Sequence, residues 1–116
     1  MPHKSQRARR VGDLIRDEMA DLLQRRIKDP RVQGLITVMA VEVTADLRHA
    51  RVQVSVLGGQ DRRDAAMAGL ESAKGFVRRA LGRRLDLRRT PEITFSLDRS
   101  LDAQERIQRL LAGEAE

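Results

Sequence analysis

The residues best able to carry chemistry in this chain lie in one short stretch, residues 73–89, with the sequence AKGFVRRALGRRLDLRR. It contains one acidic residue, Asp86, and seven basic ones: Lys74, Arg78, Arg79, Arg83, Arg84, Arg88 and Arg89. Its net charge equals the +6 of the whole chain, so the other residues are neutral on balance. Like charges one helical turn apart repel each other. The stretch therefore predicts a surface that binds a polyanion, with a solvated helix face as the alternative.

Four more basic residues near the start of the chain predict a second anchor: Lys4, Arg7, Arg9 and Arg10. The alternative is a solvated basic arm, which we place at residues 1–6. Acidic residues follow at once, at Asp13, Asp17 and Glu18, unlike a targeting presequence. No apolar run approaches the ~20 residues needed to cross a membrane. We expect a cytoplasmic protein that makes no membrane contact.

Other residue types offer little catalytic or metal-binding potential. There are no cysteines, which excludes a disulfide framework and a thiolate metal site. His3 and His49 stand in unrelated contexts, and no histidine base lies nearby in the sequence for Ser55, Ser72, Ser96 or Ser100. The carboxylates at 13, 17 and 21 alternate with arginines and predict a solvated face of ion pairs, not a divalent-ion site. We predict a protein that is not an enzyme and has no cofactor or metal.

Aromatic residues are scarce, which limits how nucleic acid can be recognised. Phe76 and Phe95 are the only two, and both positions predict core. Proteins that bind single strands commonly stack bases on exposed aromatic rings. With none predicted at the surface, contacts must be made through phosphates, where the planar guanidinium group of arginine binds well. Recognition should then depend on RNA shape and little on base identity.

The elements that position these residues follow from the spacing of apolar residues. Residues 7–28 have apolar positions at three- and four-residue steps, which predicts an amphipathic helix that ends before Pro30. Residues 35–44 and 49–57 are rich in Ile, Val and Thr and predict an antiparallel hairpin.

The basic stretch is predicted to lie on the second of two consecutive helices, 61–73 and 76–87. Between them is Ala73-Lys74-Gly75, a predicted helix-kink motif whose glycine can adopt a backbone geometry that alanine cannot. Arg84 falls within the apolar arc of the second helix, so either its side chain extends to the surface or the helix loosens there. A third strand at 93–97, a helix at 100–111 and an acidic tail at 113–116 complete the chain.

This order predicts one α+β domain over residues 1–116, with a mixed three-stranded sheet and helices on one face. The order α-β-β-α-α-β, followed by a C-terminal helix, is that of a type II KH domain, a nucleic-acid-binding fold. KH domains clamp a nucleotide backbone with a GXXG loop. No such glycine pair exists here, and Ala73-Lys74-Gly75 occupies the equivalent place.

Over nearly its whole length the sequence resembles bacterial ribosome-binding factor A. The matching segments are RARRVGDLIRDEMADLL, IKDPRVQGLITVMAVEVTADLRHARVQVSVL, AKGFVRRALGRRLDLRRTPEITFSLD and RSLDAQERIQRLL. The most characteristic parts are residues 27–32, residues 43–47 and the Ala73-Lys74-Gly75 motif. The resemblance implies a non-catalytic factor in ribosome biogenesis and rRNA processing, which binds 16S rRNA and free 30S subunits late in maturation and is linked to growth in the cold.

Two other functions fit parts of the sequence. A general DNA-binding protein would carry a similar basic surface. A protein-binding adaptor would use a helix stripe or a sheet edge, although no apolar motif can be separated from the core. A monomer is the simplest expectation.

Overall fold

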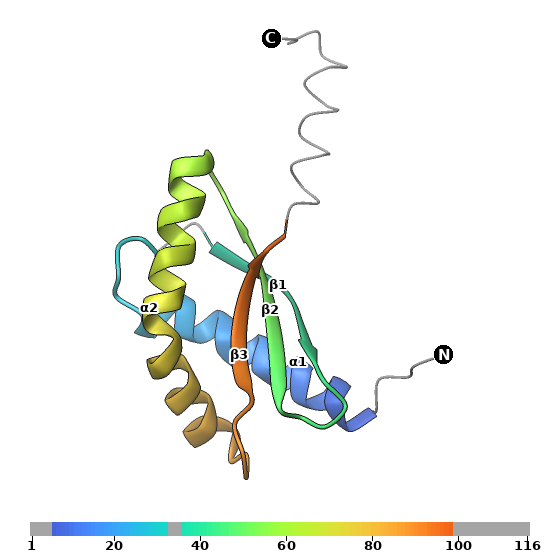
Figure 1. Ribbon diagram of the computed structural model, residues 1–116. Coiled ribbons are helices and arrows are strands. Elements are labelled where there is room, and N and C mark those ends of the chain that lie inside the picture. The colour runs from blue at the N-terminus through green and yellow to red at the C-terminus, as the bar shows by residue number, and fades with distance from the viewer. Residues whose placement is uncertain (1–5, 33–35, 99–116) are drawn as a thin grey trace, which may run out of the picture.

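In the computed structural model, residues 6–32 and 36–98 are described. Along the chain the elements are α1 (Gln6–Asp21), η1 (Leu22–Arg26), β1 (Ile36–Val43), β2 (His49–Val56), α2 (Gln60–Leu85) and β3 (Glu92–Leu97) (Figure 1). The mixed three-stranded sheet and the α+β class are confirmed. Lys4, the predicted helix at 100–111 and the predicted acidic tail lie outside the described residues.

The first predicted helix is confirmed, and its last turn is wound more loosely than the rest. α1 is a regular helix, whereas η1 is π-helical and ends at Ile27, which is extended. In the turn that follows, Asp29 accepts hydrogen bonds from the backbone N–H of Arg31 at 2.9 Å and from its Nη2 at 2.6 Å. The side-chain hydrogen bond with Arg31 lowers the pKa of Asp29 to about 2. This turn places buried Val32 against Gly69 of α2.

The sheet has the order β1-β2-β3. β1 and β2 are antiparallel, as predicted for the hairpin, and β2 and β3 are parallel. Because parallel neighbours need a long crossover, α2 must connect one end of the sheet to the other. The register shifts between Val38 and Ala40, where one extra residue forms a bulge. The bulge lets Val38 and Val43 both be buried although they are an odd number of residues apart.

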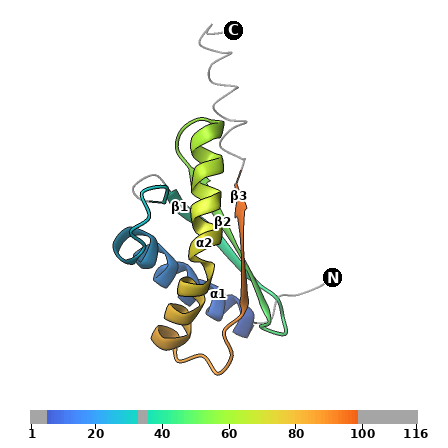
Figure 2. The ribbon, with the colours of Figure 1, turned by 60° about the vertical axis from the view of Figure 1, so that its left-hand side comes forward.

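One face of the sheet carries the core, and both helices contact that sheet (Figure 2). On β2, Val52, Val54 and Val56 are buried, whereas Arg51, Gln53 and Ser55 between them are not. This alternation is typical of a sheet with one covered and one open face. α1 and α2 also contact each other, so a seam between the helices runs over the core.

The two helices predicted for residues 61–73 and 76–87 are in fact one continuous helix, α2, so this prediction was wrong. Both ribbon views show its axis bending near the middle (Figures 1 and 2). Residues 73–75 are helical, and Gly75 is not among the residues with positive φ. The idea that Gly75 adopts a geometry closed to alanine is therefore also wrong. α2 ends where Asp86 takes a left-handed conformation with φ 50°.

We expect alanine substitutions at two glycines of α2 to have opposite effects on stability. At Gly75 a Cβ would meet only the mobile end of Arg79, at 3.4 Å, so Gly75→Ala should raise the free energy of unfolding by about 1 kcal/mol through helix propensity. At Gly69 a Cβ would lie 2.7 Å from buried Val32, so Gly69→Ala should lower it by about 1–3 kcal/mol. Urea denaturation of the two variants and of the parent protein measures both changes in the free energy of unfolding. Destabilisation by Gly75→Ala would show that glycine is required in this helix.

Candidate nucleic-acid interface

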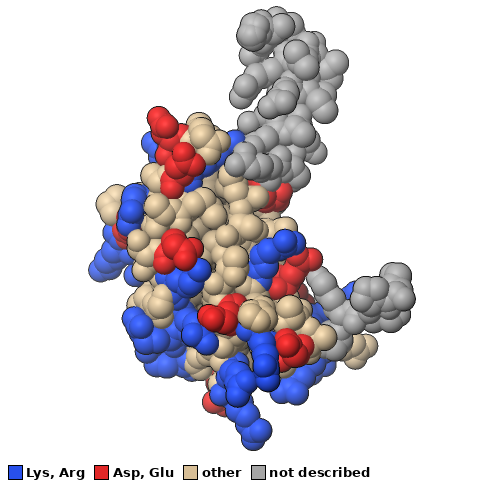
Figure 3. Space-filling view, in the orientation of Figure 1, with Lys and Arg blue, Asp and Glu red and all other residues tan. Residues whose placement is uncertain are grey.

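The structure brings the basic stretch together at one end of the molecule. Five of its basic residues lie on the second half of α2, and Arg88 and Arg89 lie in the loop that leads to β3. Figure 3 shows Lys and Arg side chains gathered over the lower part of this face, where Figure 1 places the end of α2 and that loop. Arg7, Arg9 and Arg10 are exposed on the first turns of α1. The described contacts include no hydrogen bond or ion pair that links these three to the basic stretch.

Arg84 joins α2 to α1 and is not a free surface charge. Its Nη1 donates to Glu18 Oε2 and to Asp21 Oδ2, each at 2.7 Å, and its side chain is 25% exposed. The hydrogen bond from Arg84 lowers the pKa of Asp21, and the same bond raises the pKa of Arg84. Arg84 was predicted to fall within the apolar arc of the helix. Its guanidinium lies there at the edge of the core, where it pairs with two carboxylates of α1.

Two other basic residues of the stretch also have partners. Arg78 donates from Nε to the carbonyl oxygen of Pro91 and from Nη2 to that of Thr90, both at 3.3 Å, and so ties α2 to the start of β3. Lys74 Nζ lies 2.7 Å from Glu71 Oε2, one turn earlier on α2. The Arg78–Pro91 hydrogen bond is partly buried, whereas the Lys74–Glu71 pair lies near the surface, contributes little to stability and can be exchanged for a phosphate.

The remaining four basic residues of the stretch form a group that we call the unpaired arginines: Arg79, Arg83, Arg88 and Arg89. All four lie at or near the surface, and among the described residues none makes a hydrogen bond or ion pair. Their charges are therefore not compensated within this part of the chain. Such a group attracts anions, and a guanidinium can bind a phosphate through two parallel hydrogen bonds.

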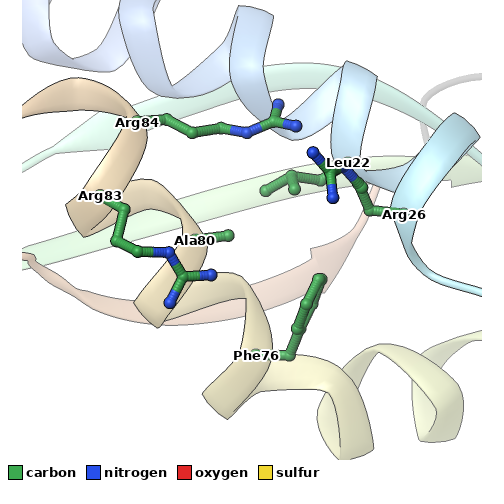
Figure 4. A pocket seen from close by; sticks show the side chains of 6 residues that line it. All are labelled: Leu22, Arg26, Phe76, Ala80, Arg83 and Arg84. Atoms are coloured by element: carbon green, nitrogen blue, oxygen red, sulfur yellow. The ribbon is translucent and has the colours of Figure 1, made fainter.

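A hollow of about 260 Å³ lies between η1 and the second half of α2 (Figure 4). Its lining residues are Leu22, Arg26, Phe76, Ala80, Arg83 and Arg84. Leu22 and Ala80 are buried core residues, so the hollow has an apolar floor. Three guanidinium groups stand around that floor.

The sequence interpretation missed two residues of this hollow. Phe95 is a core residue as predicted, but Phe76 is only partly buried and borders the hollow, so its assignment to the core was incomplete. Arg26 was not among the predicted site residues. Nothing in the local pattern marks either residue, because the hollow forms between segments about 50 residues apart.

The described residues contain neither a group of metal-ligand side chains nor a helix able to span a membrane. Within residues 6–32 and 36–98, no three His, Asp or Glu side chains are grouped so that they could hold a metal ion. No helix in those ranges is both long and apolar enough to span a bilayer. Asp21, which was considered with Asp13 and Asp17, instead pairs with Arg84 and with Arg25, whose Nε is 3.3 Å away.

Comparisons with known proteins all find the same family. A family model described as ribosome-binding factor A matches residues 7–111. A ribosome-binding factor A of Halothermothrix orenii is 49% identical over 108 residues, which cover 93% of this chain and 88% of that protein.

Solved structures are similar as well. The crystal structure of ribosome-binding factor A from Thermus thermophilus has a TM-score of 0.58 at 24% identity and covers 85% of this chain and all of that one. A homology model of the Thermus thermophilus protein, fitted into a cryo-EM map of a 30S–RbfA complex, has a TM-score of 0.60 at 26% identity. It covers 84% of this chain and 97% of that one.

We expect Arg84→Met to lower the thermal unfolding midpoint at pH 7, because it leaves Glu18 and Asp21 without their shared cation. The pKa of Asp21 in the folded protein lies below its ordinary value of 3.8. The stabilisation is therefore present above that value and is lost as the pH falls through the lowered pKa. The difference in unfolding midpoint between the variant and the parent protein should therefore become smaller as the pH is lowered toward 2. Arg79→Met, on the same helix but with no partner among the described residues, is the control. Equal midpoints for Arg84→Met and its parent at pH 7 would contradict the role of this contact.

Proposed function

Because the chain belongs to the ribosome-binding factor A family, we propose that it is a non-catalytic assembly factor that binds free small (30S) ribosomal subunits through 16S rRNA late in their maturation. The related Thermus thermophilus protein has been fitted into a map of a 30S complex, which supports this partner. In this proposal the protein acts as a monomer in the cytoplasm, in ribosome biogenesis and rRNA processing, and the role extends to growth in the cold.

The observation that carries the proposal is the group of unpaired arginines at the end of α2 and in the following loop. Each uncompensated guanidinium that meets a phosphate releases a counterion from the RNA, which favours binding and makes it depend on salt. Phosphate contacts of this kind set position and register but do not distinguish bases. Folded rRNA presents phosphates in a fixed arrangement, and α2 sets the backbone positions of Arg79 and Arg83, from which their side chains can reach those phosphates.

Within this proposal the fold is a variant of the type II KH domain. α2 takes the place of the two helices that flank the GXXG loop, and Ala73-Lys74-Gly75 marks their junction. Gly75 is exposed. Apart from the backbone of its own helix, only the end of the Arg79 side chain lies near the position that a Cβ would occupy. An RNA backbone can therefore approach α2 closely at this position, as glycine allows. Lys74 beside it would exchange Glu71 for a phosphate.

The other residues of the predicted interface take different parts. Arg78 and Arg84 are held by protein groups, so we propose that they mainly position the helix end, and that the unpaired arginines make the phosphate contacts. Lys4, Arg7, Arg9 and Arg10 remain a proposed second anchor. As an assembly factor, the protein must bind the immature subunit more tightly than the finished one, since only a difference in affinity shifts an equilibrium.

We expect Arg79→Glu combined with Arg88→Glu to lose most co-sedimentation with purified 30S subunits and to reduce the slope of log affinity against log salt by about 2, one for each lost phosphate contact. The matched control is Arg16→Glu combined with Arg62→Glu, which changes the net charge equally at exposed positions of α1 and early α2. Naked 16S rRNA and duplex DNA, compared at one salt concentration, distinguish an rRNA-binding factor from a general DNA-binding protein. Undiminished binding by the first variant would contradict the proposed interface.

A further inference from the structure

The hollow between η1 and α2 combines features that the proposed phosphate contacts do not require. Figure 4 shows the guanidinium groups of Arg26 and Arg83 and the ring of Phe76 all pointing toward one space. Arg26 comes from the end of the first helical segment, and Phe76 and Arg83 from α2. The three groups meet only because the two segments pack against each other.

Protein groups compensate only part of the charge in this hollow, since the Arg84 hydrogen bond and, more weakly, the charge of Arg26 lower the pKa of Asp21, but Arg26 forms no ion pair among the described residues. Arg84, on its upper border in Figure 4, is already paired with Glu18 and Asp21. Arg26 and Arg83 have no hydrogen bond or ion pair among the described residues, although Arg25 next to Arg26 is paired with Asp21. Two guanidinium groups directed at the same space repel each other, and an anion between them would relieve that repulsion. The fork of hydrogen-bond donors on each guanidinium suits the oxygen atoms of a phosphate.

Phe76 adds an aromatic surface to this charged site. It is the one of the chain's two aromatic residues that is not fully buried, and it packs at the edge of the core beside the apolar floor of Leu22 and Ala80. Every nucleobase can stack on an aromatic ring. A carboxylate side chain of a partner protein would satisfy the arginines but would leave the ring unused.

The size of the hollow limits what can enter it. Its volume of about 260 Å³ is slightly below the ~300–1,000 Å³ that is usual for drug-sized ligands. A single nucleotide with its phosphate fits this scale, whereas a helix or a stretch of duplex does not.

We propose that this hollow binds one unpaired nucleotide of the RNA, with its phosphate between Arg26 and Arg83 and its base against the ring of Phe76. The inference rests on the proposed function and adds a contact with a base to an interface that otherwise recognises phosphates. It replaces the expectation that no aromatic ring takes part in binding. Arg84 has a positioning role here, because its bond to α1 sets the distance between the two sides of the hollow.

Adenosine 5′-monophosphate, titrated into the full chain with ¹³C-labelled phenylalanine, tests the inference by NMR. The chain has two phenylalanines and no tyrosine or tryptophan, so the ring signals are simple to assign. The signals of Phe76 should shift with saturation, and those of buried Phe95 should not. Inorganic phosphate alone and adenosine alone should each bind more weakly than the nucleotide. An unchanged Phe76 signal at high nucleotide concentration would overturn the inference.

Substitutions separate the roles of the lining residues. Phe76→Leu keeps the apolar packing but removes the ring, and it should weaken binding of the nucleotide about tenfold. Arg26→Gln and Arg83→Gln should each weaken it by a similar factor, whereas Arg16→Gln on the exposed face of α1 should not. Thermal unfolding of each variant confirms that it is folded. Wild-type affinity in both arginine variants would overturn the inference, as would a hexaglutamate peptide that binds the hollow more tightly than the nucleotide does.

Co-sedimentation with 30S subunits distinguishes a failure of this inference from a failure of the proposed function. If the parent protein does not bind the subunit, the proposed function is wrong, whatever the nucleotide does at the hollow. If the parent binds and Phe76→Leu binds equally well, the interface stands and the nucleotide pocket does not. Reduced subunit binding by Phe76→Leu and Arg26→Gln, at unchanged stability, supports the pocket.

Discussion

A three-stranded sheet of this size can bury one face, and the arrangement of the whole molecule depends on how that face is covered. Both helices contact the sheet, and the parallel crossover from β2 to β3 requires α2 to run the length of the sheet. α1 must then lie beside α2, and the two helices meet along a seam. The bulge near Met39 and the close approach of Val32 to Gly69 serve the same packing, since each lets a buried valine reach the core.

The packing of α2 against the rest of the molecule divides its arginines into those that have protein partners and those that do not. Those directed toward another element meet protein partners, as Arg84 meets Glu18 and Asp21 and Arg78 meets the carbonyl groups before β3. On the open face of the sheet, Arg51 likewise pairs with its cross-strand neighbour Glu42, at 2.6 Å. Arg79, which is exposed, and Arg83, which borders the hollow beside η1, meet none among the described residues. A strongly basic helix can thus be stable and still present uncompensated charge to a polyanion.

Because α2 is one continuous helix, its basic surface would bind nucleic acid differently from a glycine-rich loop. A flexible glycine-rich loop adapts to a nucleic-acid backbone, whereas a continuous helix holds its side chains in one arrangement. Gly75 then contributes the absence of a side chain and not an unusual backbone conformation. The hollow beside η1 adds a site where charge and an aromatic ring converge, so that, as proposed, one surface can bind phosphates along the RNA and, beside them, one unpaired nucleotide of any base.

The sequence by itself determined the first helix, the three strands and the buried positions of β2, because helical and strand periodicity are local properties of the chain. It also located the surplus charge at residues 73–89. It did not show that residues 73–75 continue a helix, since glycine weakens a helix without ending it. Only the tertiary structure decided which arginines remain unpaired and that Phe76 borders a hollow. The partners of Arg84 lie 66 and 63 residues away, and no local pattern reports a contact that exists only when two helices pack on the same sheet face.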